Sequence, residues 1–203
     1  MAQSGRLFIF EGADGAGKTS VSAEFVQSLQ KQSWSARTLA FPGKTPNTLG
    51  ALVYRLHHNP ADCGVGSLTA ASLQTMHIAA HLDAIETVIL PALKRGECIV
   101  LDRYWWSTWV YGLVGGMQRD VLDALIEVER LAWAEWRPAR IFYIERTEPL
   151  RPEPLDTWRK LKAAYEALVA LETGKYPIQV IQNETTPEAA LRAALSQVII
   201  PPS

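Results

Sequence analysis

The stretch GADGAGKTS, residues 12–20, decides the fold of this chain. Four of its residues fit the pattern G-x-x-x-x-G-K-[ST]: Gly12, Gly17, Lys18 and Thr19. The apolar run LFIFE precedes the pattern and a helical spacing follows it, which is the context that a phosphate-binding loop needs. A strand, a loop that holds phosphate through its backbone N–H groups, and a helix with a positive N-terminal end are therefore predicted.

Each part of the loop has a predicted task. Lys18 is expected to reach the β- and γ-phosphates of a nucleotide, and Thr19 to help hold Mg²⁺. The loop residues expected to surround the phosphates are Gly12, Asp14, Gly15, Ala16, Gly17, Lys18, Thr19 and Ser20. The sequence contains no N-K-x-D element, which switch GTPases require for base reading, and is short for an ATP-driven motor. A small kinase is therefore favoured.

Short apolar runs alternate with longer amphipathic segments along the chain. Spacing typical of buried strands covers residues 7–11, 37–41, 98–102, 140–144 and 178–182. Helical spacing covers residues 18–32, 48–56, 68–93, 119–136, 155–173 and 187–200, and the longest irregular stretches are 59–66 and 146–154. This alternation predicts an α/β fold in which helices cover both faces of a parallel sheet, built as a single domain over residues 1–203.

Composition excludes several other classes of protein. A formal net charge of −1 gives no global basic field, so general adhesion to nucleic acid or to an anionic membrane is not expected. The two cysteines, Cys63 and Cys98, form neither a disulfide framework nor a metal-ligand spacing. The N-terminus lacks a signal-peptide pattern, and no apolar stretch approaches the roughly 18 residues that span a bilayer. A soluble cytoplasmic protein without a membrane partner is therefore expected.

Two segments that follow predicted strands are candidates for the acceptor site. They are FPGKTPNTLG, residues 41–50, and LDRYWWSTWVYG, residues 101–112. In open α/β sheets, ligands bind beyond the carboxyl ends of the strands. Lys44 and Arg103 are therefore candidates to clamp the anionic part of an acceptor, and the alternative for each is a solvated loop cation.

At these segments the chain resembles the thymidylate kinase family. The matching pieces, in family order, are FEGADGAGKT at 10–19, FPGKTPNTLG at 41–50, ILPALKRGECIVLDRYWWSTWVYG at 89–112 and YPIQVIQNETTPEAALRAAL at 176–195. The resemblance covers nearly the whole chain. It implies a P-loop kinase with a five-stranded parallel sheet, ATP and Mg²⁺ as cofactors, a pyrimidine deoxynucleotide as acceptor, and a homodimer. The lid expected in this chain is shorter than is usual in the family.

The resemblance also implies roles for single residues. Asp14 matches a carboxylate that approaches the acceptor sugar, and Lys44 stands where the family has an arginine on the acceptor phosphate. Arg103 matches a second phosphate-binding arginine, and Asp102 matches a carboxylate near the metal and its waters. Chemistry would then consist mostly of positioning and charge stabilisation. The remaining side chains expected around the acceptor are Phe41, Tyr104 and Tyr111.

The segment ERTEPLRPEP, residues 145–154, resembles a lid over the transferring phosphoryl group. Because the phosphate loop contains no arginine, the resemblance implies that the lid supplies this charge. Arg151, followed by Pro152 and Glu153, resembles the lid arginine and is favoured over Arg146. The alternative is that both arginines are exposed loop cations.

The base-reading positions depart from the family. His77 aligns with a phenylalanine that stacks on thymine, His81 aligns with an arginine that hydrogen-bonds the base, and Gly112 replaces a common glutamine. A spacing of four places both histidines on one face of a helix. A rebuilt base pocket is favoured, and the alternatives are histidines that only support a pocket, or a metal site. The acceptor is then expected to be other than ordinary dTMP, or to carry the same base held differently.

A base within DNA is the alternative acceptor. Thymidylate-kinase-like proteins of some phages phosphorylate the hydroxymethyl group of 5-hydroxymethyluracil in DNA, and a short lid with an enlarged pocket would leave room for a polymer. Such a protein would act in the host cytoplasm. The aromatic residues of RYWWSTW suit stacking on a base, but the spacing of Trp105, Trp106 and Trp109 suits a helix packed into the core equally well. A non-catalytic nucleotide-binding module is the lesser alternative.

Overall fold

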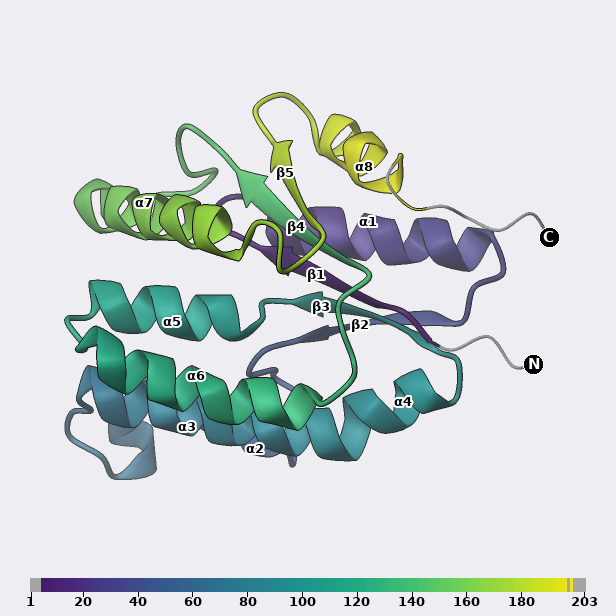
Figure 1. Ribbon diagram of the computed structural model, residues 1–203. Helices are drawn as coiled ribbons and strands as arrows, with labels where there is room; N and C mark the ends of the chain where they lie inside the picture. The colour runs from purple at the N-terminus through teal and green to yellow at the C-terminus, as the bar shows by residue number, and fades with distance from the viewer. Residues whose placement is uncertain (1–4, 197, 199–203) are drawn as a thin grey trace.

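The computed structural model describes residues 5–196 and 198, and five strands form one parallel sheet in the order β2-β3-β1-β4-β5 (Figure 1). The strands are β1 (Leu7–Glu11), β2 (Ala36–Ala40), β3 (Cys98–Asp102), β4 (Arg140–Glu145) and β5 (Ile178–Gln182). The predicted α/β fold and five-stranded parallel sheet are confirmed. Two boundaries differ slightly, since β2 lies one residue earlier than predicted and β4 ends one residue later.

Strand β1 lies at the centre of the sheet, and its side chains alternate between two hydrophobic clusters. Ile9 belongs to the cluster on one face of the sheet, whereas Phe8 and Phe10 belong to the cluster on the other. The ring of Phe10 lies 5.4 Å from that of Phe25 and 4.8 Å from that of Phe142. Because helices cover both faces, β1 and β3 are buried along their whole length and form continuous apolar runs in the sequence.

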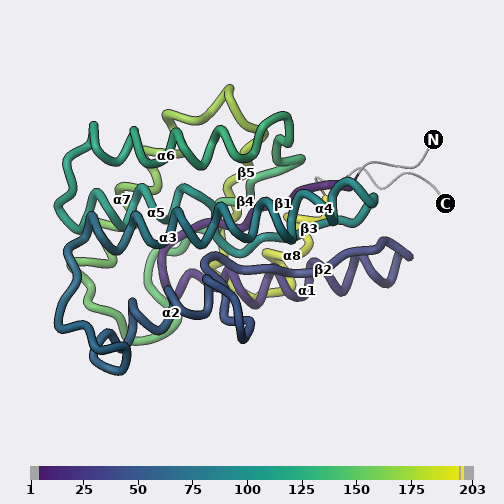
Figure 2. The backbone as a smooth tube through the Cα atoms, turned by 90° about the horizontal axis from the view of Figure 1, so that it is seen from below, coloured from purple at the N-terminus to yellow at the C-terminus, as the bar shows by residue number. Residues whose placement is uncertain are grey.

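The two helical layers differ in thickness (Figures 1 and 2). One face of the sheet is covered by α1 (Lys18–Lys31) and α8 (Pro187–Leu195). The other face carries a deeper layer, in which α2 packs on α3, and α5 packs on α3, α6 and α7. These helices are α2 (Leu49–His58), α3 (Ala70–Ala84), α5 (Trp105–Val114), α6 (Arg119–Trp133) and α7 (Leu155–Glu172). This deeper layer supplies the walls of the larger cavity described below.

The helix predicted over residues 68–93 is one continuous helical stretch with three parts. Helix α3 runs into a π-helical turn, η2 (Ile85–Ile89), which runs into α4 (Leu90–Lys94). Pro91 lies just after the π turn and has no N–H group to donate to the carbonyl group four residues earlier. The wider hydrogen bonding of a π turn therefore precedes the proline.

This stretch also corrects the expectation that no segment is long and apolar enough to span a bilayer. The helical stretch Ala70–Lys94 is 25 residues long and contains an 18-residue window with a mean hydropathy of 1.2, so it passes that test by length and composition alone. A single such helix is weak evidence for a membrane span, because the core helix of a globular protein passes the same test. Here Ile78, Ile85 and Ile89 are buried in the hydrophobic cluster beneath the sheet.

Helix α5 contains the three tryptophans for which the sequence allowed two interpretations, stacking on a base or packing into the core. Trp105, Trp106 and Trp109 are exposed by 1%, 0% and 5%, and all three belong to the hydrophobic core. The indole N–H of Trp109 donates to Asp123 of α6 at 2.8 Å. The structure therefore supports the core interpretation, because no base can stack on side chains that are covered by other helices.

Other boundaries differ where local backbone geometry ends or begins a helix. Helix α6 ends at Trp133, since Ala134 adopts a positive φ of 49°. The region 59–66, expected to be irregular, contains the short 3₁₀ helix Pro60–Cys63. The last predicted helix, 187–200, is described as far as Leu195, and part of the remaining range lies outside the described residues.

Candidate active site

The phosphate-binding loop connects β1 to α1, and its shape depends on glycine at position 17. Gly17 has a φ of 93°, and a Cβ atom there would lie 2.4 Å from Nδ2 of Asn183. The same Nδ2 donates to the carbonyl oxygen of Ala16 at 2.8 Å, so the residue after β5 supports the loop. Any other residue at position 17 would displace this support.

A cavity of about 250 Å³ lies over the loop. The loop residues that line it are Asp14, Gly15, Gly17, Lys18, Thr19 and Ser20. The other two predicted phosphate ligands do not line the cavity: Gly12 has a φ of 146° and abuts the carbonyl group of Ile144, and Ala16 is 1% exposed. Their contribution is therefore to the shape of the loop.

Lys18 is the buried cation of this cavity. Its Nζ donates to the carbonyl oxygen of Ala13 at 2.9 Å. Burial, together with repulsion from Arg103, lowers the pKa of Lys18 to about 8, although Asp102 and Asp14 act in the opposite direction. The ammonium group is held next to the loop backbone, and its charge is sensitive to mildly alkaline pH.

We expect kcat/KM for ATP to fall above pH about 8, approaching tenfold per pH unit, because the free enzyme then loses the charge of Lys18. Bound phosphate stabilises the ammonium form, so kcat at saturating ATP should fall only at higher pH. The measurement is the pH profile of both parameters between about pH 7 and pH 10. A kcat/KM that stays flat to the upper limit would contradict this assignment.

Lys18 affects folding stability and activity in opposite directions as the pH rises. The pKa of Lys18 is about 8 in the folded chain against 10.5 as its ordinary value, so the unfolded chain binds the extra proton between these pH values. This group therefore makes folding more favourable as the pH rises through that window. Thermal denaturation at each pH separates the two effects.

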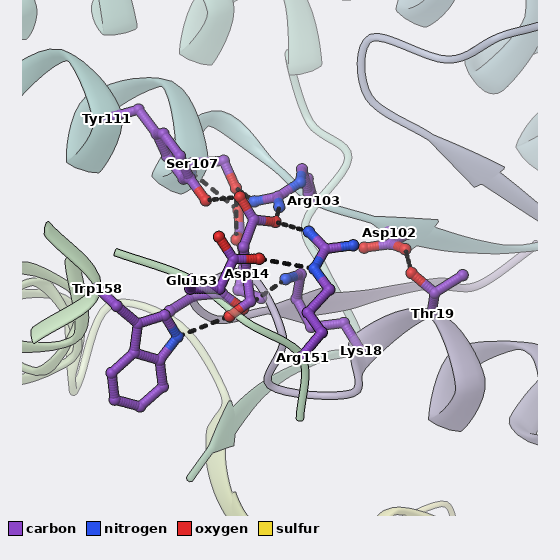
Figure 3. A network of polar contacts seen from close by, with 12 residues as sticks. Asp14, Lys18, Thr19, Asp102, Arg103, Ser107, Tyr111, Arg151, Glu153 and Trp158 are labelled. Atoms are coloured by element: carbon purple, nitrogen blue, oxygen red, sulfur yellow. Dashed lines mark hydrogen bonds and ion pairs between the residues drawn. The ribbon is translucent and has the colours of Figure 1, made fainter. Parts of the chain in front are cut away.

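Asp14 is the centre of a polar network that joins the phosphate loop to α5, to α7 and to the connections that precede these two helices (Figure 3). Its carboxylate accepts hydrogen bonds from the hydroxyl group of Tyr111 at 2.6 Å and from Nη2 of Arg103, and Nη2 of Arg151 lies 3.7 Å away. Its backbone carbonyl accepts from the indole of Trp158 at 2.6 Å. Burial alone would raise the pKa of Asp14, but Arg103 and Tyr111 help to outweigh burial and lower it. The ionised Asp14 thus holds two arginines beside the loop.

Glu11 and Arg103 fix the start of α5 beside this network. Glu11, the last residue of β1, is fully buried and accepts from the backbone N–H groups of Tyr104 at 2.6 Å and Ser107 at 3.1 Å. Arg103 adopts a positive φ of 77°, and its Nη1 donates to the hydroxyl oxygen of Ser107 at 2.9 Å. We did not identify Glu11 from the sequence, where its only signal was a carboxylate at the end of a buried strand.

Tyr104 is not at the acceptor site, which corrects its predicted role in substrate binding. Tyr104 is 2% exposed, and its ring lies 5.3 Å from the ring of Trp133. Because Glu11 holds the backbone of Tyr104 at the start of α5, the side chain turns into the core. Tyr111, two turns further along α5, is the tyrosine that reaches the site.

The two arginines of the predicted lid lie in different places. Arg151 lines the phosphate cavity and faces Asp14, and the backbone N–H of Leu150 donates to Gly15 at 2.9 Å. The segment before α7 therefore lies on the phosphate loop. Arg146 instead donates to the backbone carbonyl group of Asn183 beside β5, so it is corrected from catalytic candidate to a residue that fixes this loop.

Thr19 and Asp102 lie together at the end of the loop. The hydroxyl group of Thr19 donates to Oδ2 of Asp102 at 2.7 Å. Oδ1 of Asp102 is buried and has no hydrogen-bond partner among the residues that the structure describes. Hydroxyl and carboxylate oxygens are the ligands that Mg²⁺ prefers, so this pair fits the predicted metal position.

A second cavity, of about 960 Å³, opens beside the phosphate cavity. Its walls come from α2, α3, α5 and the loop after β2, and its volume suits a ligand the size of a nucleotide. The residues that line both cavities are Asp14, Thr19, Asp102, Arg103 and Arg151. The two cavities therefore meet where two arginines and two carboxylates converge.

The expected acceptor residues Phe41, Lys44 and Tyr111 line this second cavity. Lys44 is exposed, and its Nζ lies 4.3 Å from the centre of the Tyr54 ring. A cation over an aromatic face is attracted by the ring quadrupole. Lys44 is therefore held at the cavity rim by a residue of α2 that we did not identify from the sequence.

The four histidines of the chain all line the second cavity. Nε2 of His77 on α3 lies 3.1 Å from Nδ1 of His57 on α2, within hydrogen-bond distance. Burial, with repulsion from His81 and His57, lowers the pKa of His77 to about 3. His77 is therefore a neutral side chain at physiological pH.

His81 is held on both sides of its ring. The ring stacks on Phe41 with centroids 3.9 Å apart, and Nδ1 lies 2.8 Å from Oε2 of Glu129 on α6. Within the described part of the chain, no group of three or more His, Cys, Asp or Glu side chains is arranged to hold a metal ion. The histidines are thus part of a cavity wall, and the metal-site alternative has no support.

Comparison with known proteins identifies the family to which this chain belongs. The family model described as thymidylate kinase matches residues 10–185. A thymidylate kinase of Chlorobaculum parvum is 28% identical over 94% of this chain and 94% of its own, and one of Nitrobacter winogradskyi is 30% identical over 83% and 78%. The crystal structure of a thymidylate kinase from Ehrlichia chaffeensis shares the fold, with a TM-score of 0.77 and 18% identity over 95% of this chain and 98% of that one. The chain belongs to the thymidylate kinase family and is an ATP-dependent nucleoside monophosphate kinase.

Proposed function

We propose that this protein transfers the γ-phosphate of ATP to the phosphate of a thymidylate-like deoxynucleotide, one with a 5-substituted pyrimidine base. The observation that carries the proposal is the meeting of the two cavities at Asp14, Arg103 and Arg151. A donor phosphate on the loop and an acceptor phosphate in the larger cavity would both face these arginines. An oxygen of the acceptor phosphate then bonds to the γ-phosphorus as the bond to ADP breaks.

The residues around this point would act by positioning and by charge. Lys18 and the loop backbone bind the β- and γ-phosphates, Arg103 orients the acceptor phosphate, and Arg151 faces the charge that develops during transfer. Asp14 keeps both arginines in place before substrate arrives. Thr19 and Asp102 would hold Mg²⁺, which when bound neutralises phosphate charge.

The named activity of the relatives, thymidylate kinase, supports a thymidylate-like acceptor. The large cavity supports it as well, since Phe41 and His81 form a stacked aromatic pair in its wall. His77 presents a neutral aromatic face one turn away on the same helix. An aromatic wall of this kind suits a planar base.

Transfer of labelled γ-phosphate tests the proposal. The acceptor panel is dTMP, dUMP, 5-hydroxymethyl-dUMP, dCMP, dGMP, and DNA that contains thymine or 5-hydroxymethyluracil. We expect label on the free 5-substituted pyrimidine monophosphates, with the highest kcat/KM among the panel. Label that appears only on DNA, or only on dGMP, would overturn the proposal.

The alternative DNA-directed activity has no supporting observation among the described residues. Its candidate stacking side chains, Trp105, Trp106 and Trp109, lie in the core. The absence of a membrane partner, the cytoplasmic location and the homodimer implied by family resemblance remain proposals. Fractionation tests the first two, and analytical ultracentrifugation tests the third.

A further inference from the structure

We propose that Gln74 is a specificity-determining residue of the acceptor cavity. Its side-chain amide would pair with the edge of a uracil-type base, through the N3–H group of the base and a neighbouring carbonyl oxygen. This inference rests on the proposed function and deepens it. Gln74 lies on α3 and is not among the residues expected at the site from the sequence.

Gln74 is a buried polar side chain without a partner in the described part of the chain. It is 5% exposed and lines the cavity of about 960 Å³. Its amide forms no hydrogen bond with another described residue. Neither its oxygen nor its nitrogen is among the unpartnered atoms that are sealed from solvent, so both atoms reach the space of the cavity. A buried amide that stays unpaired is unfavourable, which favours a ligand that pairs with both atoms.

The position of Gln74 on α3 places it beside the aromatic part of the cavity wall. Residues 74, 77 and 81 are spaced by three and four, so they lie on one face of the helix, and all three line the cavity. The rings of His77 and His81 have centroids 6.1 Å apart, and the His81 ring stacks on Phe41. A planar base that packs against His77 lies one helical turn from Gln74, so an edge of the base can meet the amide.

The facing helix α5 leaves room for this side chain. Helices α3 and α5 pack against each other (Figure 2). A Cβ atom at Gly112 would lie 3.3 Å from Cγ of Gln74 and 2.4 Å from Cδ2 of Leu122. A side chain at position 112 would therefore displace Gln74. Because Gly112 stands where glutamine is common in the family, this wall takes its amide group from α3 rather than from α5.

The hydrogen-bonding groups of an amide match those of a uracil-type base. The amide carries a carbonyl oxygen that accepts and an NH₂ group that donates. Uracil and thymine carry an N3–H donor between two carbonyl oxygens, so the amide can form two parallel hydrogen bonds, one of which uses N3–H. Cytosine has a donor and an acceptor in the reverse order, which a rotated amide also matches. Gln74 therefore selects for a paired donor and acceptor, and does not separate thymine from cytosine.

A thymine analogue without this pair of groups tests the inference. The deoxynucleoside monophosphate of 5-methyl-2-pyrimidinone keeps the ring and the methyl group of thymine but lacks O4 and the N3–H proton. It forms at most one of the two hydrogen bonds and adds no atom that could clash. We expect the wild-type kcat/KM for dTMP to exceed that for the analogue by about tenfold or more, mainly through the acceptor KM. Equal use of both would overturn the inference and leave the proposed function in place.

Replacement of Gln74 by methionine assigns the preference to this side chain. Methionine has a similar length and lacks the amide, so the preference for dTMP over the analogue should fall to about threefold or less. A preference that stays at the wild-type value would overturn the inference.

Gln179→Met is the matched control. Gln179 on β5 is half-buried, donates to the carbonyl oxygen of Ala193 at 3.2 Å and lines neither cavity. Loss of its amide should leave the preference for dTMP over the analogue unchanged. An equal fall in both variants would show a general structural effect and overturn the inference.

NMR of the Gln74 side-chain amide in the wild-type protein gives a readout that needs neither activity nor a folded variant. Its NH₂ signals can be assigned through their correlations with the rest of the side chain. We expect dTMP to shift these signals, and deoxyribose 5-phosphate, which lacks a base, to leave them in place. Signals that do not move with dTMP would overturn the inference. If no monophosphate is phosphorylated, the proposed function fails independently of the NMR result.

Discussion

Replacement of Lys18 by methionine should lower kcat by about 10³-fold or more with any acceptor. Lys18, which lies close to Arg151 in Figure 3, is the buried cation of the phosphate cavity and donates to the carbonyl oxygen of Ala13. A fixed charge in a site that excludes water stabilises the charge that moves during transfer far more than the same charge would in solution. Single-turnover transfer from labelled ATP measures the loss without interference from product release.

Methionine is the informative replacement because it keeps most of the apolar stem and removes only the charge. Burial lowers the pKa of Lys18, which means that the folded protein holds this ammonium group at a cost. The melting temperature of Lys18→Met should therefore stay within a few degrees of the wild-type value or rise. An inactive variant that is also unfolded would not support a catalytic role, and a folded variant with full activity would contradict it.

Replacement of Arg103 by alanine should lower kcat/KM for the acceptor by about 10²–10³-fold, with a smaller effect on the KM for ATP. Arg103 lines both cavities, and its guanidinium is held by Asp14 on one side and Ser107 on the other. A guanidinium fixed in this way presents its remaining N–H groups to a phosphate in a set direction. Steady-state kinetics with the acceptor varied at saturating ATP measures the effect.

Arg103→Lys separates charge from geometry. Lysine keeps the charge but has a single ammonium group, which cannot bind Asp14 and Ser107 as the planar guanidinium does, so it should recover only part of the loss. Alanine and lysine both have a Cβ atom, so both carry the backbone cost of the positive φ at position 103. Arg119→Ala is the control, since Arg119 is exposed and pairs with Asp123 outside the site. A normal acceptor KM and kcat in Arg103→Ala would rule out the proposed clamp.

The sequence was sufficient to predict the features of this protein that depend on residues close together in the chain. The phosphate loop is a run of consecutive residues, and its strand, turn and helix follow from apolar spacing and from glycine at positions of positive φ. The sheet could be predicted for a similar reason, because strands buried on both faces form continuous apolar runs.

The tertiary structure decided the features that depend on residues far apart in the chain. Apolar spacing in α5 did not distinguish a core helix from a base-stacking surface, because an aromatic ring suits both until its neighbours are known. The sequence already favoured Arg151 over Arg146, but only the structure shows that Arg151 lies 3.7 Å from Asp14 while Arg146 donates to the carbonyl group of Asn183. His81 and Glu129 are 48 residues apart, and Glu129 has no local signal in α6. Sequence determined this protein where short-range backbone preferences act, and only the packing of α3 against α6 placed Glu129 next to His81, which lines the larger cavity.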